Sequence, residues 1–146
     1  MDMKDLEKAK ELLKKDNVSC VLVKGSQIIE RKERGVAPLL NLINEQVDCR
    51  CFSAADRVVG RGAAVLYINL GVNAVYGEVM SKSGKAVLEK YGISYSYGTL
   101  LDQILNRTKT DICPMEAAAN GIEDISKAPE ILGTVLEKMR ANAKNE

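Results

Sequence analysis

The amino-acid sequence predicts an α/β protein, a three-layer α/β/α sandwich with a mixed sheet. The core has to be aliphatic, because 46% of the 146 residues are hydrophobic while Trp is absent and Phe occurs once. Two short apolar segments separated by Gly25-Ser26 have the form of an antiparallel hairpin. Later apolar segments alternate between strand-like and helix-like patterns, and parallel strands need helical crossovers. A hairpin joined to parallel strands gives a mixed sheet between helical layers.

Each element of the N-terminal half has a local reason. The opening helix carries apolar residues at spacings of three and four, and Pro38 stands in the first turn of the second helix. Ser53-Ala-Ala-Asp56 has the form of a capping box, and the apolar stretch after it ends before Gly71. The predicted elements are a helix at 2–15, hairpin strands at 17–24 and 27–31, a helix at 37–44 and a third helix at 53–70.

The C-terminal half is predicted to alternate strands with helices. Gly92 closes one helix, Tyr95 and Tyr97 share one face of a strand, and Pro114 opens a short helix that ends at Asn120. No linker or repeat divides the chain, so residues 1–146 are expected to form a single domain. The predicted elements are a strand at 73–80, a helix at 82–91, a strand at 93–97, and helices at 99–107, 113–120 and 126–142.

Composition excludes several classes of function. Lys and Arg number 21 against 20 Asp and Glu, a balance that recruits neither nucleic acid nor an acidic membrane surface. His is absent, which excludes Ser-His-Asp, Cys-His and His-metal mechanisms. The charged N-terminus lacks the apolar run of a signal peptide, and no stretch approaches the ~18 apolar residues of a membrane helix. We therefore expect a cytoplasmic protein whose cysteines are reduced thiols.

Three segments together resemble a known family. They are Ser53-Ala-Ala-Asp-Arg-Val-Val-Gly-Arg-Gly-Ala-Ala64, Ser81, and Asn106-Arg107 followed by Cys113-Pro-Met-Glu116. The combination, within about residues 1–125, resembles a family of prokaryotic proteins of unknown function with a cytidine-deaminase-like fold. What the resemblance implies is that fold, and not a reaction.

Zinc-dependent deamination is not expected from this sequence. Zinc deaminases need a His or Cys plus Glu at the start of the helix after the hairpin, and P-C-x-x-C at the next strand–helix junction. The first junction here offers Ser-Ala-Ala-Asp-Arg at 53–57, and the second offers Ser81-Lys-Ser-Gly84. The four cysteines also lack the paired C-x-x-C spacing of structural zinc sites. We therefore predict neither a bound metal nor a cofactor.

Cys113 is the best single candidate for chemistry. Pro114 at the first helical position makes Cys113 the N-cap, where the helix dipole favours a thiolate. Glu116 can act as a general acid or base beside that thiol. Alternatively, Cys113 only caps the helix and Glu116 closes a capping box. Both interpretations stay open at this point.

Five charged or polar side chains are candidates for ligand binding. Arg107, beside Asn106 at a predicted helix end, can bind a carboxylate or phosphate through two hydrogen bonds. Alternatively, its charge only stabilises the negative C-terminal end of the helix dipole. Arg57 and Arg61 lie one turn apart on the predicted third helix, beside Asp56. They form either a cationic spot at a ligand cleft or the solvated edge of a buried helix, with Asp56 as its capping carboxylate.

Ser81 completes the candidate site. It stands at a strand-to-helix junction, where free N–H groups can hold an anion; the alternative is an ordinary serine N-cap. Ligands of open α/β sheets bind beyond the carboxyl ends of the strands. We therefore expect Asp56, Ser81, Arg107 and Cys113 to open onto one shared cleft.

Two functions are consistent with such a cleft. The first is a module that binds a small anionic or nucleotide-like molecule and needs no reactive group. The second is a thiol-dependent enzyme that uses Cys113 with Glu116 as acid or base. A purely structural role has no exposed heptad or apolar stripe to support it. By analogy with deaminase-like domains, we expect a homo-oligomer, a dimer.

Overall fold

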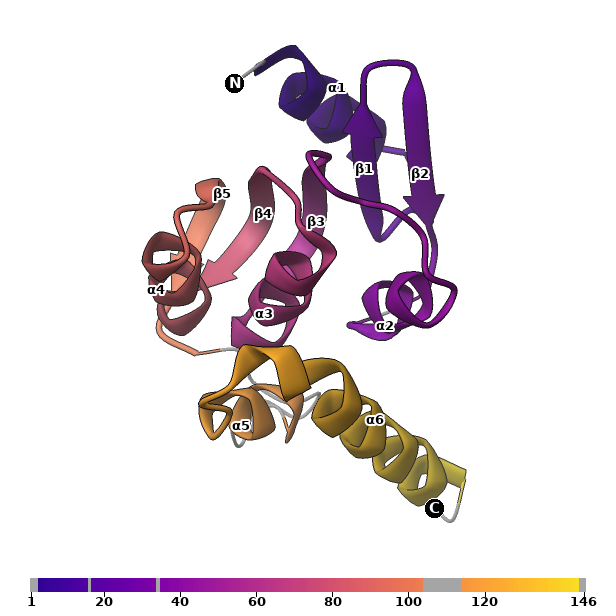
Figure 1. Cartoon of the computed structure of the whole chain (residues 1–146), viewed down its shortest axis with the longest axis vertical. Helices are drawn as coiled ribbons and strands as arrows, with labels where there is room; N and C mark the ends of the chain where they lie inside the picture. The colour runs from indigo at the N-terminus through magenta and orange to yellow at the C-terminus, as the bar shows by residue number, and fades with distance from the viewer. Residues whose placement is uncertain (1–2, 16, 34, 104–113, 145–146) are drawn as a thin grey trace.

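This computed structural model describes residues 3–15, 17–33, 35–103 and 114–144. Within them, five strands form one mixed sheet in the order β2-β1-β3-β4-β5 (Figure 1). Strand β1 (Cys20–Lys24) is antiparallel to both β2 (Gln27–Arg31) and β3 (Ser53–Val59). Strands β3, β4 (Ala74–Ser81) and β5 (Ser94–Leu101) run parallel to one another. The predicted α/β class and the mixed sheet are confirmed.

Helices pack against the sheet in two groups. Side chains alternate along β1, so Val21 packs with Leu13 of α1, whereas its neighbour Leu22 joins the larger cluster formed with the other helices. The helices are α1 (Met3–Leu13), α2 (Ala37–Asn44), α3 (Arg61–Leu70), α4 (Lys82–Lys90), α5 (Pro114–Asn120) and α6 (Ala128–Lys144), with a 3-10 turn at Ile125–Lys127.

The predicted helix at 53–70 is wrong over its first part. Residues Ser53–Val59 are strand β3, and the helix begins only at Arg61. Strand β3 lies between β1 and β4, so most of its side chains are buried on both faces, and such a short apolar run has no periodicity that distinguishes it from a buried helix. Ser53 and Asp56 therefore do not form a capping box.

The predicted helix at 99–107 is also wrong where the structure describes it. Strand β5 continues to Leu101, and its last residues pair with the end of β4, Ser81 opposite Leu101. Residues 104–107 lie outside the described residues. The remaining predicted elements are confirmed, with ends that differ by a few residues.

The regular alternation of side chains between the two faces of the sheet is interrupted in all three parallel strands, at the same position along each strand. In each strand, two residues five positions apart join the same cluster, although strict alternation would place them on opposite faces. The interruption leaves Val58 44% exposed while Val59 is fully buried. These pairs are Ala54 and Val59 in β3, Val75 and Met80 in β4, and Tyr95 and Leu100 in β5.

Candidate functional site

A buried carboxylate marks the place where two helices begin beside the sheet. Glu116, on α5, is 4% exposed, and its two carboxylate oxygens accept the backbone N–H of Arg61 at 2.8 and 2.9 Å. Its Oε1 also accepts the hydroxyl of Ser83 at 2.7 Å and that of Ser81 at 3.2 Å. One carboxylate therefore connects the starts of α3 and α4 to α5.

The parallel strands explain why these donors lie together. Because β3 and β4 run in the same direction, the helices that follow them start at the same edge of the sheet, where first-turn N–H groups lack helical partners. In α4, the hydroxyl of Ser81 accepts the N–H of Gly84 at 3.0 Å and caps the helix. The N-cap of α3 is Gly60, which has no side chain. Glu116 supplies the missing acceptor from 55 residues further along the chain.

Arg61 holds both ends of α5. While its N–H bonds to Glu116, its guanidinium Nε donates to the carbonyl of Ala119 at 2.9 Å, and a terminal nitrogen donates to the carbonyl of Ile122 at 3.3 Å. These carbonyls lie at and beyond the C-terminal end of α5, where cations are favoured. The guanidinium of Arg61 is thus bound within the protein.

Arg57 lies apart from Arg61. It belongs to β3 and points toward the connection between α1 and β1, where its guanidinium donates to the carbonyls of Val18 and Lys15, each at 3.0 Å. It also forms an ion pair with Glu78 of β4 at 2.6 Å. The two arginines do not form the shared cationic spot expected from a helix, because the segment that carries Arg57 is extended.

Asp56 belongs to a separate buried cluster under α3. Asp56 is 6% exposed and lies opposite Cys20 in the pairing of β1 with β3, and its carboxyl group accepts the hydroxyl of Tyr67 at 2.6 Å. Burial raises the pKa of Asp56 to about 7, against the lowering effect of the Tyr67 hydroxyl. Burial also raises the pKa of the Cys20 thiol far above its usual range, which makes this thiol unreactive.

The structure brings together two of the predicted site residues, Ser81 and Glu116. Asp56 is distant from them: it pairs with Gly77, and Ser81 lies four residues further along β4, roughly 13 Å away in a strand. Asn106, Arg107 and Cys113 lie outside the described residues, so the expected cleft with Arg107 and Cys113 stays a prediction. Sequence reasoning misses Tyr67, although a Tyr inside an apolar helix needs a partner for its hydroxyl when buried.

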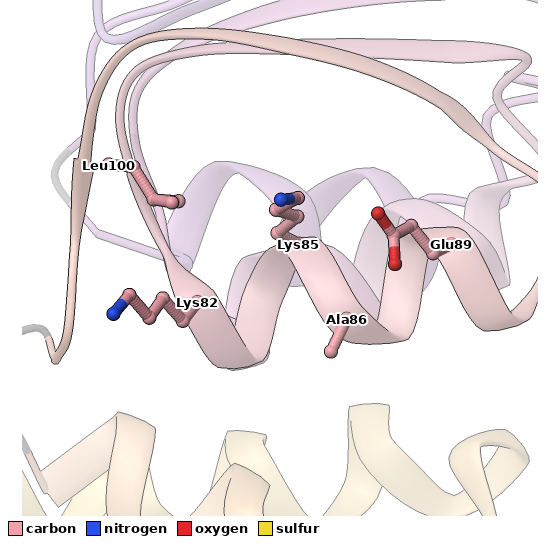
Figure 2. Close-up of a pocket in the computed structure, with 5 residues that line it drawn as sticks. All are labelled: Lys82, Lys85, Ala86, Glu89 and Leu100. Carbon is pink, nitrogen blue, oxygen red and sulfur yellow. The ribbon is translucent and has the colours of Figure 1, made fainter.

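A second feature lies on the surface between α4 and β5. A depression of about 250 Å³ is lined by four residues of α4 and one of β5 (Figure 2). At one end, the ammonium group of Lys82 forms an exposed ion pair with Asp102 at 2.7 Å. The lining residues are Lys82, Lys85, Ala86, Glu89 and Leu100.

The described residues contain neither a cluster of metal ligands nor a helix that could span a membrane. In the described ranges, His, Cys, Asp and Glu nowhere gather in a group of three that could hold a metal ion. Over the same part of the chain, no helix has the length and apolar character needed to cross a membrane.

Comparisons with known proteins place the chain in a family. A family model described as a domain of unknown function (DUF1893), TM1506, matches residues 8–136. The crystal structure of a DUF1893 family protein (TM1506) from Thermotoga maritima is similar at a TM-score of 0.80 and 25% identity, covering 94% of this chain and 92% of that one. No curated protein matches. The chain therefore belongs to the DUF1893 family, a domain of unknown function.

Proposed function

We propose that this protein binds a small anionic ligand at the joint start of α3 and α4. The anion site consists of the backbone N–H of Arg61 and the hydroxyls of Ser81 and Ser83. The observation that carries the proposal is that these donors already hold a carboxylate, that of Glu116. The carboxylate or phosphate of a ligand has the same acceptor chemistry and suits the same helix starts.

The ligand takes the place of Glu116 in this proposal. Because Glu116 is part of the chain, it competes with any free anion. The apparent affinity for the anion is the intrinsic affinity multiplied by the fraction of molecules in which the Glu116 carboxylate is displaced. The protein would then change between an internally closed state and a ligand-bound state. A nucleotide-like ligand would present its phosphate to the anion site.

The strand order supports a deaminase-like arrangement as part of the same proposal. Strand β1 lies antiparallel beside the parallel strands β3, β4 and β5, and a helix follows β3 and another follows β4; the sequence resemblance implies this organisation. Helix α1 on the face opposite the other helices would make three layers. In zinc deaminases, the two corresponding helix starts supply the metal ligands. Here the same positions carry Gly60-Arg61 and Ser81-Lys-Ser83. The anion site would occupy the place of the zinc, by analogy of fold alone.

Removing the internal carboxylate tests the proposal. Glu116→Ala should lower the thermal midpoint, because the buried donors of the anion site lose their acceptor. Acetate and inorganic phosphate should then raise that midpoint saturably and bind the variant roughly tenfold more tightly than the wild type, in which Glu116 competes. Calorimetric titration at constant ionic strength measures both affinities.

Glu130→Ala is the matched control, because Glu130 is an exposed acid in the first turn of α6. It should bind the two anions as the wild type does. If Glu116→Ala responds to acetate and phosphate no more than Glu130→Ala, the donors do not form an anion site. If only the variant binds and the wild type shows no saturable response to either anion, Glu116 is a permanent cap and the proposed function is wrong.

The purified protein is expected to contain no stoichiometric zinc. The chain has no His, and the starts of α3 and α4 carry neither Cys nor Glu that could act as deaminase ligands. Elemental analysis after extensive dialysis measures this directly. One zinc per chain would contradict the prediction and would require ligands from elsewhere in the chain.

A further inference from the structure

Strand β5 forms one edge of the sheet in the part of the chain that the structure describes. Within the described residues, no strand pairs with its outer side (Figure 1). Its eight residues, Ser-Tyr-Ser-Tyr-Gly-Thr-Leu-Leu, include neither a charge nor a proline, and Tyr97 is 38% exposed. The opposite edge, β2, carries Glu30 and Arg31, both in ion pairs. Uncharged exposed edges of this length are templates for a further strand.

The depression beside β5 adds a self-complementary helix face. Lys82, Lys85, Ala86 and Glu89 follow the three- and four-residue spacing of one stripe along α4. Figure 2 shows Lys85 and Glu89 projecting from α4 toward the side on which Leu100 lies, with Ala86 pointing to the other side of the helix. The stripe is basic at its start and acidic at its end, with a small residue near its middle.

The middle of strand β5 lies beside the middle of the stripe on α4. The Tyr95 hydroxyl donates to Glu89, whereas Leu100 lines the depression with Lys82, so β5 and α4 run antiparallel. The middle of β5 therefore lies beside Ala86. A two-fold axis through this point, perpendicular to the sheet, would pair two β5 strands antiparallel and place two α4 helices side by side.

We propose that two copies of this chain form a dimer through β5 and α4 about this axis. Main-chain hydrogen bonds between the two β5 strands would join the sheets, and Ala86 at the axis would allow the helices to approach. Lys82 of each copy would face the partner's Glu89, because the axis reverses the stripe. Lys82 already bonds to Asp102, but both groups are exposed and an ammonium has three donors. The interface is isologous and closed, so assembly stops at two copies.

A charge placed on the edge strand tests the pairing. Tyr97→Lys would bring two like charges together near the axis, so we expect it to shift the protein from the mass of two chains toward the 16.0 kDa of one. Ile28→Lys is the matched control, because Ile28 is 42% exposed on the opposite edge strand. It should leave the mass unchanged. Sedimentation over a range of concentrations up to millimolar measures both, and circular dichroism verifies folding.

A charge exchange on α4 tests the axis itself. Lys82→Glu and Glu89→Lys should each weaken the dimer roughly tenfold, since each makes two like-charge contacts across the axis. The double variant should recover wild-type affinity, because it restores both pairs with exchanged signs. A wild-type protein that stays monomeric at every concentration overturns the proposal. A dimer that Ile28→Lys disrupts, or whose double charge variant fails to recover, overturns it as well.

Discussion

Replacing Asp56 by asparagine is expected to remove about 4 kcal/mol of pH dependence from the free energy of unfolding. The pKa of Asp56 is raised from 3.8 to about 7 in the folded protein, chiefly by burial. The folded state therefore binds the proton more tightly than the unfolded state does. The stabilisation is fully present below pH about 4 and is lost as the pH rises through about 7.

Urea unfolding between pH 4 and pH 8 measures this effect. The wild type should lose stability across that range, whereas Asp56→Asn should lose much less and should be the more stable protein at pH 8. Asp48→Asn is a suitable control, because the pKa of the exposed Asp48 is lowered to about 2 and the group stays ionised throughout. Parallel profiles for the wild type and Asp56→Asn would show that Asp56 is ionised in the folded state at all these pH values.

Replacing Gly84 by valine is expected to lower the free energy of unfolding by about 3 kcal/mol. A Cβ at Gly84 would stand 3.0 Å from the carbonyl carbon and oxygen of Gly60 and from the carbonyl oxygen of Val59. These are backbone atoms of the buried β3–α3 junction and cannot rotate away. The first turn of α4 would have to shift, which would strain the hydrogen bonds from Ser81 and Ser83 to Glu116.

Gly133→Val provides the matched comparison. Gly133 is also helical, in α6, but a Cβ there meets nothing within 4 Å, so the substitution changes only the intrinsic helix propensity. Denaturant unfolding of both variants separates the packing effect from the propensity effect. Equal stability of the two variants would mean that α4 does not approach the β3–α3 junction as closely as the structure has it.

The hairpin, α2, β4 and α4 could be predicted because each carries a local signal. Gly25 has the positive φ of 61° that a two-residue turn needs, and Pro38 lies in the first turn of α2. Strand β3 had no such signal. The alternation of its side chains between the two faces of the sheet is interrupted between Asp56 and Val59, so this seven-residue strand lacks the pattern that identifies a half-buried strand.

The site could be predicted only in part, for a similar reason. The sequence predicts Ser81 and Glu116 as separate candidates, but they are 35 residues apart and meet only because α5 packs over the helix starts. The donor of Arg61 that binds Glu116 is its backbone N–H, which every residue except proline has. A pattern of side chains therefore cannot predict which main-chain N–H will bind the carboxylate. The side chain of Arg61 suggested an external anion, and it is instead bound to carbonyls of the protein.

The attachment of α5 through Arg61 also bears on hydrogen exchange and on the order of folding. Helix α5 has seven residues, fewer than the ~12–15 at which isolated helices become even marginally stable. Both of its ends depend on Arg61, through Glu116 at one end and the carbonyl of Ala119 at the other. We therefore expect α5 to become ordered together with α3, and not before it. In the native protein its amide hydrogens should exchange as one group, ahead of those in the central strands.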